Sequence, residues 1–190
     1  MAKQIKTSQN RWSTKQLVVI ALMCAISALF SFVQIPIIPA APFLTYDPSL
    51  VPAMVVGFAT GPAAGFCTGA IAAVIHGLML GDWVGTLMNL VATFCFVVPA
   101  AAIYVRKRTF AGGVIGLAAG CVLATAGSLL ANGTIGVGFY YGSADVFFTY
   151  MPFLALFNVI KTVLNSLLTA LIYKAISNLI TPKKNQVSGF

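Results

Sequence analysis

Long apolar runs are the feature of this sequence that most restricts its fold. A bilayer core of about 30 Å is crossed by a helix of about 20 apolar residues. Apolar segments of this kind recur along the chain, separated mainly by proline, glycine and charged residues, at 17–33, 49–60, 62–80, 84–104, 111–131 and 150–180. We therefore predict an all-α integral membrane protein with six transmembrane helices, forming a single domain over residues 1–190.

The composition excludes an ordinary soluble domain. Hydrophobic residues make up 59% of the chain and charged residues 7%, whereas an average soluble domain has roughly 25% charged residues. The mean hydropathy is +0.97. A soluble fold of this size and composition would expose apolar side chains over its whole surface. The lipid bilayer is therefore the expected environment.

The net charge of +8 indicates topology and not a nucleic-acid partner, because the positive charges flank apolar segments. They form three clusters: Lys3, Lys6, Arg11 and Lys15; Arg106, Lys107 and Arg108; and Lys174, Lys183 and Lys184. Cytoplasmic loops are enriched in lysine and arginine. Six spans with both termini in the cytoplasm place all three clusters inside, whereas five spans do not. The only acids, Asp47, Asp82 and Asp145, then fall in outer loops.

Lys161 is a lone positive charge inside the last apolar segment. A charge at bilayer depth costs about 3 kcal/mol on insertion scales, so it usually faces the protein interior and serves a ligand, ion or proton. Asn158 precedes it by three residues and Asn165 follows by four, which places all three on one helical face. The alternative is a lysine that merely reaches toward the membrane surface. We favour a binding role.

Enzyme chemistry has little support in this sequence. There is one histidine, His76, and no glutamate, nucleophile motif or phosphate-binding loop. The four cysteines are isolated within apolar runs, which suggests neither metal ligands nor disulfides. The polar groups within the spans are mainly amides, namely Asn89, Asn132, Asn158 and Asn165, together with Lys161. We predict a non-enzyme without metal or cofactor that hydrogen-bonds a flat, neutral ligand.

Small residues four apart occur on three of the predicted helices. They are Ala21 and Ala25; Gly65 and Gly69; and Gly112, Gly116 and Gly120. Such spacing lets helices approach closely in lipid. For the third and fifth segments we predict packing within the protein.

Several motifs resemble those of a known family, the substrate-binding (S) components of energy-coupling factor (ECF) vitamin transporters. The most specific runs from Phe157 to Lys161 (FNVIK) and continues at 169–174 (TALIYK). Supporting matches lie at 46–53, 61–65 and 83–89. Within the family the chain is most similar to the riboflavin-specific type. It departs from the family pattern at Leu156, at Pro48 and in the glycine-rich stretch 133–138.

The resemblance implies capture of riboflavin without catalysis. Asn158, Lys161 and Asn132 match family residues that hydrogen-bond the isoalloxazine and ribityl groups, and Asn89 is a further polar candidate. The first outer loop, 35–46, would roof a pocket walled by the outer halves of spans four to six. Candidate apolar or stacking side chains are Phe43, Leu44, Tyr46 and Trp83.

The resemblance also implies partners. The family pairs such a subunit with a membrane coupling subunit and two cytoplasmic ATPases in the bacterial cell membrane, and Ala21 and Ala25 match its docking face. Two alternatives stay open at this point. One is an S component for another vitamin, such as pantothenate, folate or thiamine. The other is a small self-contained carrier or channel that uses Lys161 as a gating or anion-binding charge.

Overall fold

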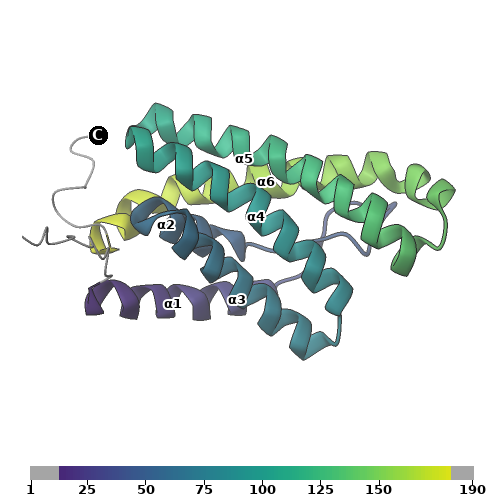
Figure 1. Cartoon of the computed structure of the whole chain (residues 1–190), viewed down its shortest axis with the longest axis horizontal. Helices are drawn as coiled ribbons and strands as arrows, with labels where there is room; N and C mark the ends of the chain where they lie inside the picture. Colours follow the sequence, from purple (N-terminus) through teal and green to yellow (C-terminus); the bar gives the residue numbers. More distant parts are fainter. Residues whose placement is uncertain (1–12, 181–190) are drawn as a thin grey trace, which may run out of the picture.

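The computed structural model describes residues 13–180, with side chains described up to residue 173. Basic residues predicted to mark the cytoplasmic side at 3, 6, 11, 183 and 184 lie outside this range. The helices are α1 (Thr14–Ser31), α2 (Leu50–Thr60), α3 (Pro62–Leu80), α4 (Trp83–Lys107), α5 (Phe110–Ala131), the π-helix η1 (Asn132–Tyr141) and α6 (Ala144–Ile180). They form an elongated bundle (Figure 1).

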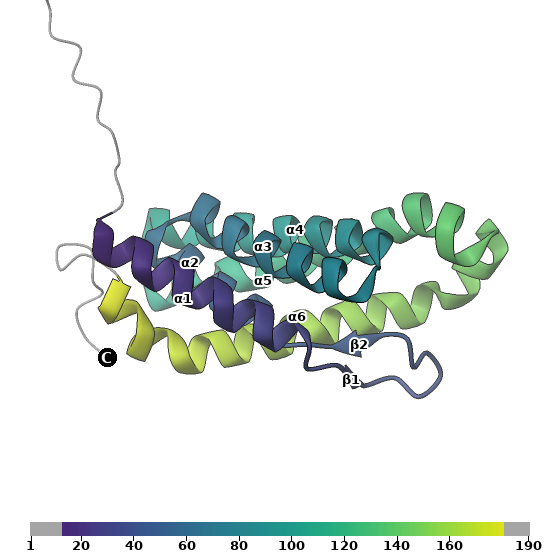
Figure 2. The same cartoon turned by 90° about the horizontal axis from the view of Figure 1, so that it is seen from below.

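The helices alternate in direction, so their connections gather at two ends of the bundle (Figures 1 and 2). One end holds the start of α1, the α2–α3 and α4–α5 junctions and the end of α6. We call it the basic end, because Arg106, Lys107 and Arg108 lie there. The opposite end, the hairpin end, holds the segment between α1 and α2 and the turns at Gly81 and Gly142.

Five of the described helical segments are long and apolar enough to cross a membrane, whereas α2 is not. Its 11 residues give a length of about 16 Å, roughly half of the hydrocarbon core. Gly61 ends α2 with a backbone φ of 113°, a conformation that favours glycine, and Pro62 begins α3. Helix α1 begins three residues before its predicted segment, and α6 begins six residues before the predicted start at 150.

The segment between α1 and α2 was expected to be a plain loop, but it contains two short strands. Strands β1 (Ile35–Pro36) and β2 (Thr45–Tyr46) pair antiparallel. Figure 2 shows this hairpin beside the first half of α6. Ile38 and Ala41, between the strands, pack on Phe157 of α6 in one buried cluster. Apolar contact therefore fixes the hairpin on the helix that carries Lys161.

The predicted spans 111–131 and 150–180 leave the glycine-rich residues between them as a loop, and this expectation is wrong for most of that stretch. Residues 132–141 continue α5 as a π-helix, and the chain turns only at Gly142, with φ at 69°. Backbone groups in lipid must be hydrogen-bonded within the chain, which favours helix even where glycine weakens it. Side chains add support, since Thr134 Oγ1 donates to the carbonyl oxygen of Leu130 at 2.7 Å.

The half of the bundle nearer the basic end is closely packed around a cluster from α2, α4 and α5. Its buried members include Met54, Phe58, Phe96, Val97, Tyr104 and Leu117. Glycine brings the helix backbones together, as predicted for α3 and α5. A Cβ on Gly65 would lie 2.6 Å from Gly57 Cα, and a Cβ on Gly116 would lie 2.6 Å from the carbonyl oxygen of Ala100.

Candidate ligand-binding cavity

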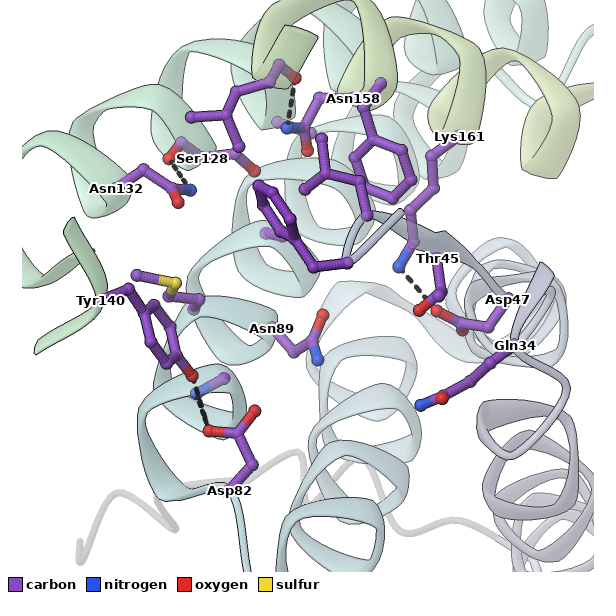
Figure 3. A pocket seen from close by; sticks show the side chains of 18 of the residues that line it. Gln34, Thr45, Asp47, Asp82, Asn89, Ser128, Asn132, Tyr140, Asn158 and Lys161 are labelled. Carbon is purple, nitrogen blue, oxygen red and sulfur yellow. Dashed lines mark hydrogen bonds and ion pairs between the residues drawn. The ribbon is translucent and has the colours of Figure 1, made fainter. Parts of the chain in front are cut away.

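A cavity of about 720 Å³ lies toward the hairpin end, within the range of roughly 300–1,000 Å³ typical of small-molecule sites. Its lining comes from α2 to α6, from η1 and from the segment between α1 and α2. The shortness of α2 makes this space available, because the helix begins only at Leu50, on the cavity wall. Figure 3 shows the polar side chains that face the cavity from several elements.

Lys161 is not a lone charge, contrary to the sequence interpretation. Its Nζ lies 2.6 Å from Asp47 Oδ2, and the two side chains are 12% and 15% exposed. The partners are 114 residues apart in sequence, so spacing along a helix gives no sign of the pair. Asp47 does stand two residues before the cap of a helix, where an anion is favoured. This position before a helix is the sequence signal that could have drawn attention to Asp47.

Several groups hold Asp47 in place beside Lys161. The Ser49 N–H donates to Asp47 Oδ1 at 3.1 Å, and the Ser49 hydroxyl donates to the same oxygen. Asn165 Nδ2 donates to the carbonyl oxygen of Lys161 at 2.9 Å and to that of Asp47 at 3.4 Å. Asn165 is fully buried and does not line the cavity. It therefore ties the chain before α2 to α6 and leaves ligand contact to its neighbours.

Three predicted asparagines, Asn89, Asn132 and Asn158, line the same cavity as Lys161. Asn158 is buried, and its Nδ2 donates to the carbonyl oxygen of Leu154 at 2.8 Å, one turn earlier. Asn132 Nδ2 donates to the carbonyl oxygen of Ser128, while its Oδ1 accepts from the Tyr141 hydroxyl, both at 2.8 Å. Because Nδ2 of Asn158 is used in the bond to Leu154, its Oδ1 is left as an acceptor for a ligand.

Two further polar pairs on the cavity wall were not predicted as site residues. Gln34 Nε2 lies 3.2 Å from His76 Nε2, and the His76 ring stacks on Phe32 with centroids 5.3 Å apart. At another side, the Tyr140 hydroxyl donates to Asp82 Oδ1 at 2.6 Å, as Figure 3 shows. Asp82 also caps α4. Both pairs join elements distant in sequence, which is why periodicity does not reveal them.

Of the four apolar candidates, Phe43 and Leu44 line the cavity. Phe43 meets Tyr150 edge-on at 5.5 Å, and Tyr150 faces Tyr141 at 6.3 Å. Tyr46 and Trp83 do not line the cavity, and here the sequence expectation needs correction. Trp83 points outward and is 57% exposed.

Tyr46 fails to reach the cavity for a different reason, since its side chain is buried within the fold. Its hydroxyl has no hydrogen-bond partner within the described part of the chain.

The fold and this cavity define a membrane-embedded binding protein, and comparison with known proteins identifies its class. The chain belongs to the family of ECF transporter substrate-specific components, whose model matches residues 15–173. It is similar to the riboflavin transporter RibU of Staphylococcus aureus, with 28% identity over 177 residues, covering 89% of this chain and 94% of the relative. That relative is a transporter and not an enzyme.

Solved structures agree with this assignment. One, described as the S component of a bacterial ECF transporter, superposes with a TM-score of 0.76 at 28% identity, covering 88% of this chain and 98% of the other. ThiT of Listeria monocytogenes superposes with a TM-score of 0.64 at 12% identity, covering 88% and 97%. At that identity the likeness to ThiT concerns the fold alone.

Proposed function

We propose that this protein is the riboflavin-binding S component of an ECF transporter and takes part in riboflavin uptake. One observation carries the proposal: the asparagines and the lysine that resemble the family's flavin-binding residues all line one cavity of suitable size. The S. aureus relative is named as a riboflavin transporter and is matched along nearly its whole length, which supports the choice of ligand.

The chemistry of the cavity suits a flavin. The isoalloxazine ring is flat and has carbonyl acceptors and an N–H donor along one edge, while the ribityl chain has only hydroxyls. The Lys161 ammonium has three donors, of which Asp47 occupies one. Asn158 Oδ1 is an acceptor one turn away. The rings of Phe43, Tyr141 and Tyr150 supply aromatic contact for the flat ring.

The orientation we propose has six spans, with both termini in the cytoplasm and the cavity toward the outside. It is supported by Arg106, Lys107 and Arg108 at the basic end, since positive residues are enriched on the cytoplasmic side. Of the acids, Asp47 and Asp82 lie at the hairpin end. The short α2 counts as the second span in this scheme, with its preceding loop inside the membrane thickness. We propose that the described residues form one domain in the bacterial cell membrane.

The partners we propose are a membrane coupling subunit and two cytoplasmic ATPases. Ala21 and Ala25 are exposed on α1, one turn apart. Small side chains on an exposed helix face allow another helix to approach closely in lipid. Ser27 and Ala28 are buried inside the bundle, so the exposed small side chains belong to the part of α1 that comes before them. The sequence has no phosphate-binding loop of its own, so energy for uptake would come from a partner.

Ligand identity is tested with the purified full-length protein. Riboflavin at 100 times its dissociation constant would stabilise the folded state by about 2.7 kcal/mol, which is measurable as a rise in the unfolding temperature. Thiamine, pantothenate and folate serve as matched ligands. Stabilisation by one of these and not by riboflavin would assign the cavity to that vitamin. Riboflavin uptake by cells lacking all ECF partner subunits would instead favour a self-contained carrier.

A further inference from the structure

The ionisable side chains that line the cavity include a lysine, yet their charges do not sum to a positive value. Among the described residues that line it, Lys161 is the only lysine or arginine. Two carboxylates, Asp47 and Asp82, line the same cavity. Counting His76 as neutral, the wall has one positive and two negative charges, so the lysine does not make the cavity a positive site.

The ion pair neutralises Lys161 from a fixed position. Asp47 is held by both the N–H and the hydroxyl of Ser49, at the start of α2. Its carbonyl oxygen also accepts from Asn165 of α6. Because Ser49 holds the carboxylate of Asp47 and Asn165 holds its backbone, the carboxylate remains beside the ammonium while a ligand uses the other two donors of Lys161.

We propose that Asp47 is a specificity-determining residue, which makes the cavity select uncharged flavin over phosphorylated flavin. The inference rests on the proposed function and extends it to the charge class of the ligand. A phosphate monoester carries about 1.5 to 2 negative charges at pH 7. A site discriminates against such a ligand when its own charges leave the added group without a counter-charge.

Asp82 strengthens this discrimination from a second position. In the view of Figure 3 the Asp82–Tyr140 pair and the Asp47–Lys161 pair lie on different sides of the cavity, with Asn89 between them. An anionic group inside the cavity therefore meets two carboxylates. Asp47 is already paired with Lys161, and Asp82 has no cationic partner among the described lining residues. A neutral ribityl chain meets the same groups as hydrogen-bond acceptors.

The test compares the dissociation constants of riboflavin and riboflavin 5′-phosphate for purified wild type and Asp47→Asn. We expect wild type to bind riboflavin more tightly than riboflavin 5′-phosphate. In Asp47→Asn the ratio of the two dissociation constants should change at least tenfold in favour of the phosphate. A purely structural role for Asp47 would weaken both ligands equally and leave the ratio unchanged. Asp47→Glu keeps the charge and should keep the wild-type ratio.

Asp145→Asn is the matched control, because it removes an acid outside the cavity lining and should leave the ratio unchanged. If Asp47→Asn does not fold, Asp82→Asn tests the same electrostatic argument and should shift the ratio in the same direction. If every folded cavity variant still binds riboflavin and has the wild-type ratio of dissociation constants, the inference is overturned. A wild-type protein that binds neither flavin would instead overturn the proposed function.

Discussion

Replacing Lys161 by methionine separates the two roles that the structure gives this lysine. The change keeps the length of the side chain and removes its charge. Lys161 Nζ lies 2.6 Å from Asp47 Oδ2 and also faces the cavity. The substitution therefore removes both the counter-charge of Asp47 and a donor for the proposed ligand.

The stability effect follows from the environment of the pair. Breaking a fully buried ion pair by removing one partner costs about 3–5 kcal/mol, because the other charge is left uncompensated. Here the side chains are 12% and 15% exposed, and Ser49 still donates to Asp47. We therefore expect Lys161→Met to lower the free energy of unfolding by about 1–3 kcal/mol, somewhat less than for a fully buried pair. The double variant Lys161→Met/Asp47→Asn should recover most of this loss, since it contains neither charge.

The effect on binding has a different origin and a different pattern. A hydrogen bond to a charged group contributes about 1.5–3 kcal/mol, which corresponds to roughly 10- to 150-fold in affinity. Riboflavin should bind at least tenfold more weakly to Lys161→Met. The double variant should not recover affinity, because the donor is still missing.

Titration calorimetry with riboflavin and thermal unfolding of the ligand-free protein measure the two effects separately. Wild-type affinity in Lys161→Met would refute a ligand role and leave Lys161 as a structural partner of Asp47. Recovery of affinity together with stability in the double variant would refute the separation of the two roles.

Three further outcomes test the docking face, the packing and the cavity wall. Ala25→Trp should bind riboflavin like wild type yet fail to support its uptake by cells, because a bulky ring holds the partner helix away; normal uptake would remove the docking role. Gly65→Val should lower thermal stability by about 1–3 kcal/mol through overpacking, whereas Gly138→Ala, with no atom within 4 Å of the added Cβ, should not. Trp83→Phe should change riboflavin affinity by less than about threefold, since Trp83 lies outside the lining, and a larger loss measured by titration would return it to the site.

The sequence predicts the helices well because lipid imposes a simple rule. Each span needs an apolar run, and proline or glycine marks most of its ends, as at Gly61 and Gly81. The rule fails for residues 132–141, where glycine suggested a loop and the demand for backbone hydrogen bonds kept a helix. The close contacts of Gly65 and Gly116 were also predictable, because their spacing indicates a helix face.

The cavity is predictable only where its residues share one helix. Asn158 and Lys161 are three residues apart, so helical geometry places them together. The ion pair with Asp47 depends on how the hairpin packs on α6, and the position of Asp47 before α2 gives no sign of which residue it pairs with. The same limit explains Tyr46 and Trp83, whose residue types suit a flavin site but whose side chains point elsewhere.

The closely packed half of the bundle has a consequence for the permeability of the membrane. Met54 and Phe58 follow Leu50 along α2, and Phe96 follows Ala92 along α4, so the core lies directly beyond the cavity floor. Protein interiors of this kind contain few voids larger than a water molecule. A subunit at rest in the membrane would therefore conduct neither ions nor water, and a cell could keep it there permanently without dissipating its ion gradients.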